Sequence, residues 1–185
     1  MSDPQFHRYT AAQAREQRAA VESIYRRSYV EAIESGHEFD DPAAFMTRFD
    51  AYTRAQGFDL VIGSLDGRPI GQSWGWPLQP GAAWWTNLVL DDPDTDRDEF
   101  VHETGTRTFA LSEIMVDRAH TGLGYARALH DELLSPREEV RATLLVENDN
   151  TRAYGRYQRW GWSRVGSLKP HWPNAPTFDV MVRKL

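Results

Sequence analysis

A segment near the middle of the chain has the residue types and spacing to bind phosphate. Residues 111–126 read Leu-Ser-Glu-Ile-Met-Val-Asp-Arg-Ala-His-Thr-Gly-Leu-Gly-Tyr-Ala, an apolar run ending at Val116 and then a Gly-x-Gly turn, Gly122 and Gly124, that opens a helical pattern. The first N–H groups of a helix have no partner within it, the helix dipole favours an anion there, and glycine lets a ligand approach closely. The segment therefore indicates a phosphate-bearing ligand, with a tight turn that binds nothing as the alternative.

Two common phosphate-binding motifs do not fit this turn. A dinucleotide-binding fold needs Gly-x-Gly-x-x-Gly close to the first strand, whereas the third glycine position here is Arg127 and the turn lies past the middle of the chain. A P-loop needs Gly-Lys followed by Ser or Thr, and the sequence contains no such run. The turn must therefore be interpreted together with other parts of the chain.

Composition limits the class of protein. The 185 residues predict one domain, residues 1–185, and 41% hydrophobic and 26% charged residues are ordinary for a globular chain. The absence of cysteine excludes disulfides, thiolate metal sites and a cysteine nucleophile. A net charge of −6 without a basic cluster argues against nucleic acid as a partner. No apolar run approaches the ~20 residues of a membrane span, and the start lacks a signal-peptide pattern, so we expect a cytoplasmic protein.

Apolar periodicity and turn residues predict a mixed α/β protein. A capping-box pattern begins at Thr10, Asp41-Pro42 opens a second helix, and Asp66-Gly67 predicts a hairpin turn. Strands are predicted at 6–9, 58–65, 69–78, 107–116, 141–146, 162–168 and 177–182, and helices at about 11–34, 42–56, 122–134 and 151–160. Residues 79–106 read as mostly irregular. The order β-α-α-β-β-β-α-β-α-β-β indicates a mixed sheet with helices on its faces.

A second motif gives the glycine turn a specific interpretation. Residues 150–162 read Asn-Thr-Arg-Ala-Tyr-Gly-Arg-Tyr-Gln-Arg-Trp-Gly-Trp and begin 26 residues after Gly124. This run resembles the Asn-x-x-Ala-x-x-x-Tyr-x-x-x-Gly-aromatic signature of the GCN5-related N-acetyltransferase (GNAT) superfamily, and the turn resembles that family's pyrophosphate loop. The element order is also similar over essentially the whole chain. Ala119 is a departure, because the family prefers Gln or Arg there and Arg118 lies one position earlier.

The resemblance implies a GNAT fold with a splayed central pair of parallel strands and acetyl-CoA as co-substrate. We expect no metal, because the six histidines are scattered and no pair has the helical spacing of metal ligands. The resemblance also implies that Ile114, Met115 and Val116 pair through their backbone with the pantetheine arm and acetyl group. The loop that would hold the pyrophosphate comprises His120, Thr121, Gly122, Leu123, Gly124 and Tyr125. It further implies that Asn150 contacts the cofactor and that Tyr157 is the general acid that protonates the CoA thiolate. A core-packed aromatic is the alternative for Tyr157.

An attacking ammonium must first lose a proton, and Glu113 is the leading candidate for the base. It precedes the segment that pairs with the cofactor, and its side chain should alternate with that of Ile114 across the sheet. A glutamate that pairs with an arginine is the alternative. Glu147 is the second choice for the base. His171 lies in the 169–174 connection, which in this family often borders the acceptor site, although an exposed loop histidine is the more ordinary interpretation.

Two further features bear on the acceptor. Four of the seven tryptophans lie at positions 74, 76, 84 and 85, where they could form an aromatic wall for a flat or cationic acceptor or pack in a core or subunit interface. Packing is the favoured interpretation, and Trp76 and Trp85 are the candidate substrate-binding residues. Residues 91–103 hold seven acids and one arginine and favour a solvated loop over a field that attracts a polyamine.

Three functions are compatible with these features. The first is transfer of an acetyl group to a primary amine of a small molecule by direct attack in a ternary complex. The second is a protein or peptide N-acetyltransferase, and the third is a non-catalytic acyl-CoA-binding regulatory module. The acidic balance and the tryptophans favour the first, and the tryptophans would also suit a homodimer.

Overall fold

The computed structural model describes residues 3–171 and 174–185, and the chain divides into two compact units. Unit 1 comprises residues 1–76 and 112–136, and unit 2 comprises residues 77–111 and 137–185. The strand β5, Thr108–Val116, belongs to both, because its first residues lie in unit 2 and its last in unit 1. Each unit is described by itself.

Unit 1 contains three antiparallel strands and the end of β5. β1 (Gln5–Thr10) pairs with β2 (Asp59–Leu65), and β2 pairs with β3 (Arg68–Pro77). The predicted hairpin turn is confirmed, since Asp66 and Gly67 have φ angles of 51° and 76°, as a two-residue turn with both residues at positive φ requires. The strand order β1-β2-β3-β5 places the end of β5, which leads into the glycine turn, beside β3.

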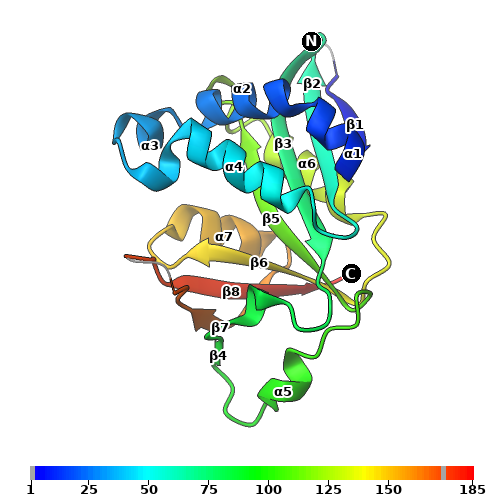
Figure 1. The fold of residues 1–185 in the computed structure, drawn as a ribbon, viewed down its shortest axis with the longest axis vertical. Helices are drawn as coiled ribbons and strands as arrows, with labels where there is room; N and C mark the ends of the chain where they lie inside the picture. Colours follow the sequence, from blue (N-terminus) through cyan, green and yellow to red (C-terminus); the bar gives the residue numbers. More distant parts are fainter. Residues whose placement is uncertain (1–2, 172–173) are drawn as a thin grey trace. The chain divides into compact units, whose positions relative to one another are not determined.

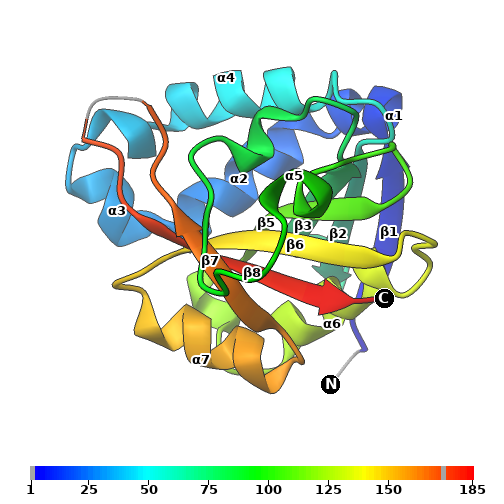
Figure 2. The same cartoon turned by 90° about the horizontal axis from the view of Figure 1, so that it is seen from below.

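Helices cover both faces of these strands, as Figures 1 and 2 show for α2, α4 and α6. The helical segments of unit 1 are α1 (Ala11–Glu16), α2 (Arg18–Ser28), α3 (Val30–Glu34), η1 (Glu38–Asp40), α4 (Pro42–Tyr52), η3 (Arg118–His120) and α6 (Tyr125–Leu134). Buried side chains of α2 and α4 pack with those of β2, β3 and β5, for example Ile24, Phe49, Leu60 and Trp74. α6 lies against the opposite face, where the buried Ser73 hydroxyl donates to the Leu129 carbonyl at 3.1 Å.

Gly71 on β3 marks a close approach of β3, β5 and α6. A Cβ atom placed at this residue would lie 2.8 Å from Leu129 Cδ1 and 2.9 Å from the Met115 carbonyl oxygen. Both distances are shorter than van der Waals contact, and the second neighbour is backbone. The absence of a side chain therefore lets α6 and the last residues of β5 pack on β3, which fixes where the glycine turn begins.

Substitution of Gly71 by alanine is expected to destabilise the protein by about 1–3 kcal/mol, because the added methyl group overpacks a buried contact. Chemical denaturation followed by circular dichroism would measure the free energy of unfolding. Gly155→Ala is the matched control, because the nearest atom to its Cβ position is the end of the Arg159 side chain at 3.7 Å and alanine favours a helix. Equal stabilities of the two variants would contradict the overpacking.

Unit 2 is built on the start of β5 and four further strands. Its elements are β4 (Val89–Leu90), α5 (Arg97–Phe100), β6 (Arg141–Glu147), α7 (Thr151–Arg159), β7 (Ser163–Leu168) and β8 (Phe178–Lys184). The strand order is β5-β6-β8-β7-β4, with β5 and β6 parallel and the other neighbours antiparallel. The parallel ladder covers only Thr108–Ala110 and Arg141–Thr143, as expected for the predicted splayed pair. Figure 2 shows α7 along one face of these strands.

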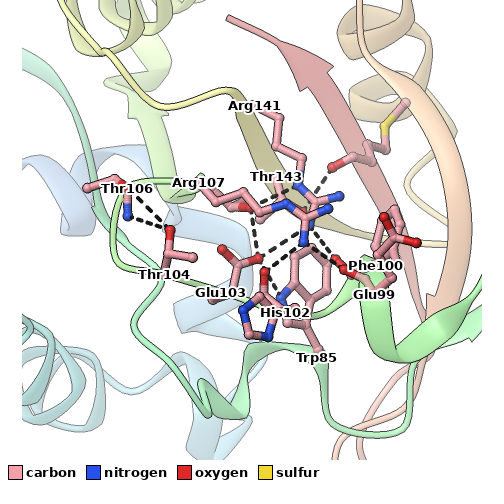
Figure 3. A network of polar contacts seen from close by, with 12 residues as sticks. Trp85, Glu99, Phe100, His102, Glu103, Thr104, Thr106, Arg107, Arg141 and Thr143 are labelled. Carbon is pink, nitrogen blue, oxygen red and sulfur yellow. Dashed lines mark hydrogen bonds and ion pairs between the residues drawn. The ribbon is translucent and has the colours of Figure 1, made fainter.

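A buried polar network connects residues 85–107 to β5 and β6 (Figure 3). The Glu103 carboxylate accepts hydrogen bonds from the Trp85 indole N–H at 3.0 Å, the Thr108 hydroxyl at 2.8 Å and the Arg141 guanidinium at 3.3 Å. Glu103 is only 3% exposed. The acidic segment predicted to be solvated thus ends in a residue that organises the interior of unit 2.

The structure differs from the predicted elements in four places. The helix predicted at 42–56 ends at Tyr52, because residues 53–57 form turns and a bend. The helix predicted at 11–34 is three helices, interrupted at Gln17 and Tyr29, because the apolar spacing continues across both breaks and gives no sign of them. The helix predicted from Gly122 begins at Tyr125. The irregular stretch 79–106 contains two short helical segments and β4, which lies so close to Gly166 that a Cβ there would be 2.2 Å from the Val89 carbonyl oxygen.

Candidate functional site

The glycine turn forms an exposed approach to the N-terminus of α6. Gly122 and Gly124 have φ angles of 82° and 88°, a left-handed conformation that costs a side-chain-bearing residue about 1–2 kcal/mol. Gly124 is the N-cap of α6, and the first bond within the helix runs from the Ala128 N–H to the Gly124 carbonyl at 3.1 Å. The two glycines therefore turn the chain sharply from η3 into α6.

The backbone N–H groups of this turn fall into two sets. Those of His120 and Thr121 donate to the carbonyls of Asp117 and Arg118, at 2.8 Å and 3.4 Å, so they are occupied within η3. Those of residues 122–124 have no acceptor among the residues that the structure describes, and the first turn of a helix leaves its own N–H groups unbonded. A run of N–H groups with no acceptor at an exposed helix N-terminus suits an anionic ligand.

Asp117 fixes the entry to the turn. Its carboxylate accepts from the Ala119 N–H at 3.0 Å and from Arg27 Nε at 2.6 Å, while its own N–H donates to the Ile70 carbonyl at 2.7 Å. Burial acts to raise the pKa of Asp117, but the hydrogen bonds from Arg27 and Ala119 outweigh it and the pKa is lowered. The carboxylate is thus held ionised at the position where β5 gives way to the turn.

Glu113 lies on β5 with its side chain toward α2 and α4. Met115, two residues further on, packs in the buried cluster formed by those helices, and residues two apart on a strand share a face. Burial raises the pKa of Glu113 to about 7, an effect that the positive charge of Arg48 partly offsets. The carboxyl group therefore changes its charge near neutral pH, which is the property a general base needs.

Two tyrosines lie within electrostatic range of this carboxyl group. Burial raises the pKa of Tyr52, and the negative charge of Glu113 adds to the effect. Burial likewise raises the pKa of Tyr25 to about 12, with Asp40 and Glu113 among the charges that contribute. The Tyr52 ring stacks on the Trp76 ring with centroids 4.9 Å apart. Glu113, Tyr52 and Trp76 thus form one part-buried neighbourhood within unit 1.

α7 carries the other two residues that the family motif singles out. Asn150 is its N-cap, and its side-chain oxygen accepts from the Ala153 N–H at 3.1 Å. Tyr157, two turns along, is part-buried and contacts Trp160 and Trp162 edge to face, with centroids at 5.8 Å and 6.3 Å. The predicted helix start at Asn150 is therefore confirmed, and Tyr157 is part of an aromatic cluster in unit 2.

His171 lines an open cavity of about 620 Å³ in unit 2. Its Nε2 lies 3.2 Å from Asn87 Nδ2, which also donates to the Lys169 carbonyl at 2.9 Å. Asn174 and Thr177 are further lining residues, whereas residues 172–173 of the same connection lie outside the described residues. His171 is therefore an exposed residue placed beside polar groups that a ligand could meet.

Trp85 is 3% exposed, and its indole N–H is bonded to Glu103 (Figure 3). Its ring also contacts Phe100 edge to face, with centroids 5.5 Å apart. This position favours the packing interpretation of the tryptophan cluster. Among the residues described, no group of three or more His, Cys, Asp and Glu is placed to hold a metal ion. No helix in residues 3–171 and 174–185 is long and apolar enough to cross a membrane.

Sequence reasoning did not identify Arg48 and Tyr52 as neighbours of Glu113. In the sequence Tyr52 is one of several apolar or aromatic residues of its helix, and Arg48 belongs to no motif. The available signal was their spacing, since residues four apart on α4 share a helix face. That spacing cannot reveal which strand the face meets, because the contact with β5 joins residues about 60 positions apart in sequence.

A mixed α/β sheet whose fifth strand leads into a glycine turn and a helix N-terminus is an arrangement that suits a phosphate-bearing ligand. The sequence profile of the acetyltransferase (GNAT) family matches residues 18–162, and the chain belongs to this family. The family assignment that the two motifs suggested is thereby confirmed, and the protein is an acetyltransferase by membership. No curated protein shows significant sequence similarity to the chain.

Solved structures show the same fold at low sequence identity. An acetyltransferase from Thermus thermophilus is 14% identical with a TM-score of 0.65, over 100% of this chain and 98% of the other. The ribosomal-protein-S18-alanine N-acetyltransferase from Escherichia coli is 13% identical with a TM-score of 0.63, over 98% and 94%. A GNAT family acetyltransferase from Elizabethkingia anophelis, solved with acetyl-CoA bound, is 13% identical with a TM-score of 0.62, over the full length of both chains. The predicted fold class is therefore confirmed.

Proposed function

We propose that this protein transfers the acetyl group of acetyl-CoA to a primary amine of a small molecule, by direct attack in a ternary complex. The observation that carries the proposal is Glu113, a part-buried carboxyl group with a pKa of about 7 on the strand that leads into the glycine turn. The family membership supplies the donor class, and a similar fold has been solved with acetyl-CoA bound. Strongly shifted pKa values cluster at functional sites, which favours an enzyme over a non-catalytic module.

The proposed roles follow the chemistry of amide formation. Glu113 takes a proton from the ammonium of the acceptor, and the amine nitrogen then forms a bond to the acetyl carbonyl carbon. The bond between that carbon and the CoA sulfur breaks, and the Tyr157 hydroxyl donates a proton to the departing thiolate. The nitrogen loses its second proton as it becomes the amide, and a proton returned through solvent restores the Tyr157 hydroxyl. Orientation of the two substrates contributes much of the acceleration.

We propose that three parts of the chain hold acetyl-CoA, which supplies the activated acetyl group. The backbone of Ile114, Met115 and Val116 would pair with the pantetheine arm and polarise the acetyl carbonyl. The 120–125 turn would hold the pyrophosphate, with the N–H groups of residues 122–124 as its main donors, while Asn150 would contact the arm. The N–H of His120 is bonded within η3, which makes its backbone the weakest of the proposed donors.

Trp76 is the tryptophan that we propose for the acceptor side, because it is part-buried and stacked on Tyr52 beside Glu113. His171 stays a second candidate for acceptor contact, and the buried Trp85 would act only through packing. We propose that residues 1–185 act as a single domain, since the family match spans parts of both units. We also propose a cytoplasmic location and a homodimer, and only the sequence supports these two parts of the proposal.

Release of CoA thiol in the presence of acetyl-CoA and separate panels of small primary amines and of peptides tests this function. We expect amine-dependent release with members of the small-amine panel. Release with peptides alone would instead favour a protein or peptide acetyltransferase. Thermal stabilisation by acetyl-CoA with no release on either panel would favour a non-catalytic module.

Gly124→Ala is expected to weaken acetyl-CoA binding by about tenfold, because a side chain at φ 88° strains the turn and displaces the N–H groups that would meet the pyrophosphate. Isothermal titration calorimetry would measure the dissociation constant. Gly36→Ala is the matched control, since Gly36 has a similar φ of 74° and an equally open Cβ position but lies outside the turn. Equal affinities for Gly124→Ala and Gly36→Ala would remove the turn from the proposed cofactor site.

A further inference from the structure

Arg48 on α4 is a part-buried cation without an anionic partner among the residues that the structure describes. Its guanidinium lies 3.9 Å above the Phe39 ring and 5.8 Å from the Phe45 ring centroid. Within residues 3–171 and 174–185, no carboxylate lies within ion-pairing distance of it and no carbonyl or hydroxyl accepts from it. Neighbouring arginines of unit 1 differ, since Arg18 bonds Asp50 and Arg27 bonds Asp117.

The geometry leaves the hydrogen-bonding edge of this guanidinium available. An aromatic ring engages the flat face of a guanidinium, whereas the five N–H donors point outward in its plane. The Phe39 contact is of this kind, with the guanidinium carbon 3.9 Å from the ring centroid. The in-plane donors match the two oxygens of a carboxylate or phosphonate, which accept in parallel from one guanidinium.

Glu113 provides an opposite charge in the same surroundings. The Arg48 charge acts on the Glu113 carboxyl and on Tyr25 and Tyr52, so the four groups lie within electrostatic range of one another. No ion pair at 4.0 Å or less joins Arg48 to Glu113 among the described residues. Arg48 and Glu113 are thus groups of opposite charge within electrostatic range of each other that form no ion pair, so each can meet a group of a bound ligand.

We infer that the acceptor is a small zwitterionic amine, with its anionic group on Arg48 and its amine on Glu113. This inference rests on the proposed function and names the substrate class of that site. An α-amino acid or an aminophosphonate has the two charges a few bonds apart, as a bridge between the residues requires. The stacked pair Tyr52 and Trp76, with centroids 4.9 Å apart, would border the carbon skeleton with its edges.

Matched sets of acceptors separate the anionic group from the rest of the molecule. We would compare L-phenylalanine with L-phenylalaninamide and phenethylamine, L-leucine with L-leucinamide and isopentylamine, and aminoethylphosphonate with ethylamine. Thiol release gives kcat/KM for each, expressed per concentration of neutral amine so that acceptor pKa values do not distort the comparison. The variants are Arg48→Met, which keeps the length of the chain but removes the charge, and Arg54→Met, an exposed arginine of the same unit, as the control.

We expect at least one zwitterion to have a kcat/KM about tenfold or more above that of the matched acceptors that lack its anionic group. The difference should come mainly from a lower KM. Arg48→Met should reduce this preference to within about threefold, and Arg54→Met should preserve it. Equal use of zwitterions and simple amines by the wild type, or a loss in Arg48→Met that is the same for every acceptor, would overturn the inference and leave the proposed function standing. Acetyl-CoA binding without turnover on any amine would instead overturn the proposed function, and the inference with it.

Discussion

Glu113→Gln is expected to lower kcat/KM by at least about 100-fold at pH 8. This figure is the lower limit of the rate contribution that a general base typically makes. Glutamine keeps the shape of the side chain but cannot take the proton of the acceptor ammonium. Acetyl-CoA affinity should change little, because the proposed contacts of β5 with the donor are made by its backbone. Glu16→Gln is the control, since it removes an exposed carboxylate of the same unit.

The pH dependence of kcat/KM distinguishes a base from a residue that only packs. With a pKa of about 7, Glu113 is protonated and inactive at pH 6 and ionised at pH 8, so the wild-type profile should rise through pH 7. The Gln variant should lose this limb and keep only the rise due to ionisation of the amine itself. An unchanged limb near pH 7 in Glu113→Gln would assign the titration to another group.

The same pKa has a consequence for stability, with a definite sign. The pKa of Glu113 is higher in the folded protein than in an unfolded chain, so between these two values the folded state binds more protons and its stability falls as pH rises. Replacement by Gln removes this loss. We therefore expect Glu113→Gln to raise Tm relative to wild type more at pH 8 than at pH 5, as differential scanning fluorimetry would show.

Tyr157→Phe is expected to lower kcat by more than about tenfold with little change in acetyl-CoA affinity. The substitution keeps the ring, and with it the edge contacts to Trp160 and Trp162, and removes only the hydroxyl that would protonate the thiolate. Stability should therefore stay close to that of the wild type. The loss should appear in kcat because the proton is needed only as the bond to sulfur breaks.

Tyr154→Phe is the control for this substitution, because Tyr154 is another part-buried tyrosine of α7, three residues earlier. Steady-state kinetics and calorimetry on both variants separate turnover from binding. Wild-type turnover in Tyr157→Phe would remove the general-acid role. A loss that is equal in both variants would show that it comes from the helix and not from the Tyr157 hydroxyl.

Features with a local cause could be predicted from the sequence. Positive φ at Gly122, Gly124 and Gly67, and the cap at Asn150, follow from residue type at a turn or helix start. The position of Glu113 opposite Ile114 follows from strand alternation. The spacing between the glycine turn and the 150–162 motif then indicated the family, and the family implied the splayed pair of parallel strands.

Features that depend on long-range packing could not be predicted. The neighbourhood of Arg48 and Glu113 requires knowledge of which strand α4 covers. The strand β4 forms because Gly166 admits its backbone, and no periodicity in residues 79–106 indicates it. The burial of Glu103 and Trp85 depends on Arg141, which is distant in sequence and donates to the same Glu103 oxygen as Trp85 and Thr108.

The destination of the acetyl group tests the proposed reaction most directly. Acetyl-CoA labelled with ¹³C in the acetyl group would be incubated with the protein and its best amine, and the products followed by NMR and mass spectrometry. We predict that the label appears as an N-acetyl amide of the amine, in amounts equal to the CoA released. Label found only as free acetate, at a rate independent of the amine, would contradict the proposed acetyl transfer.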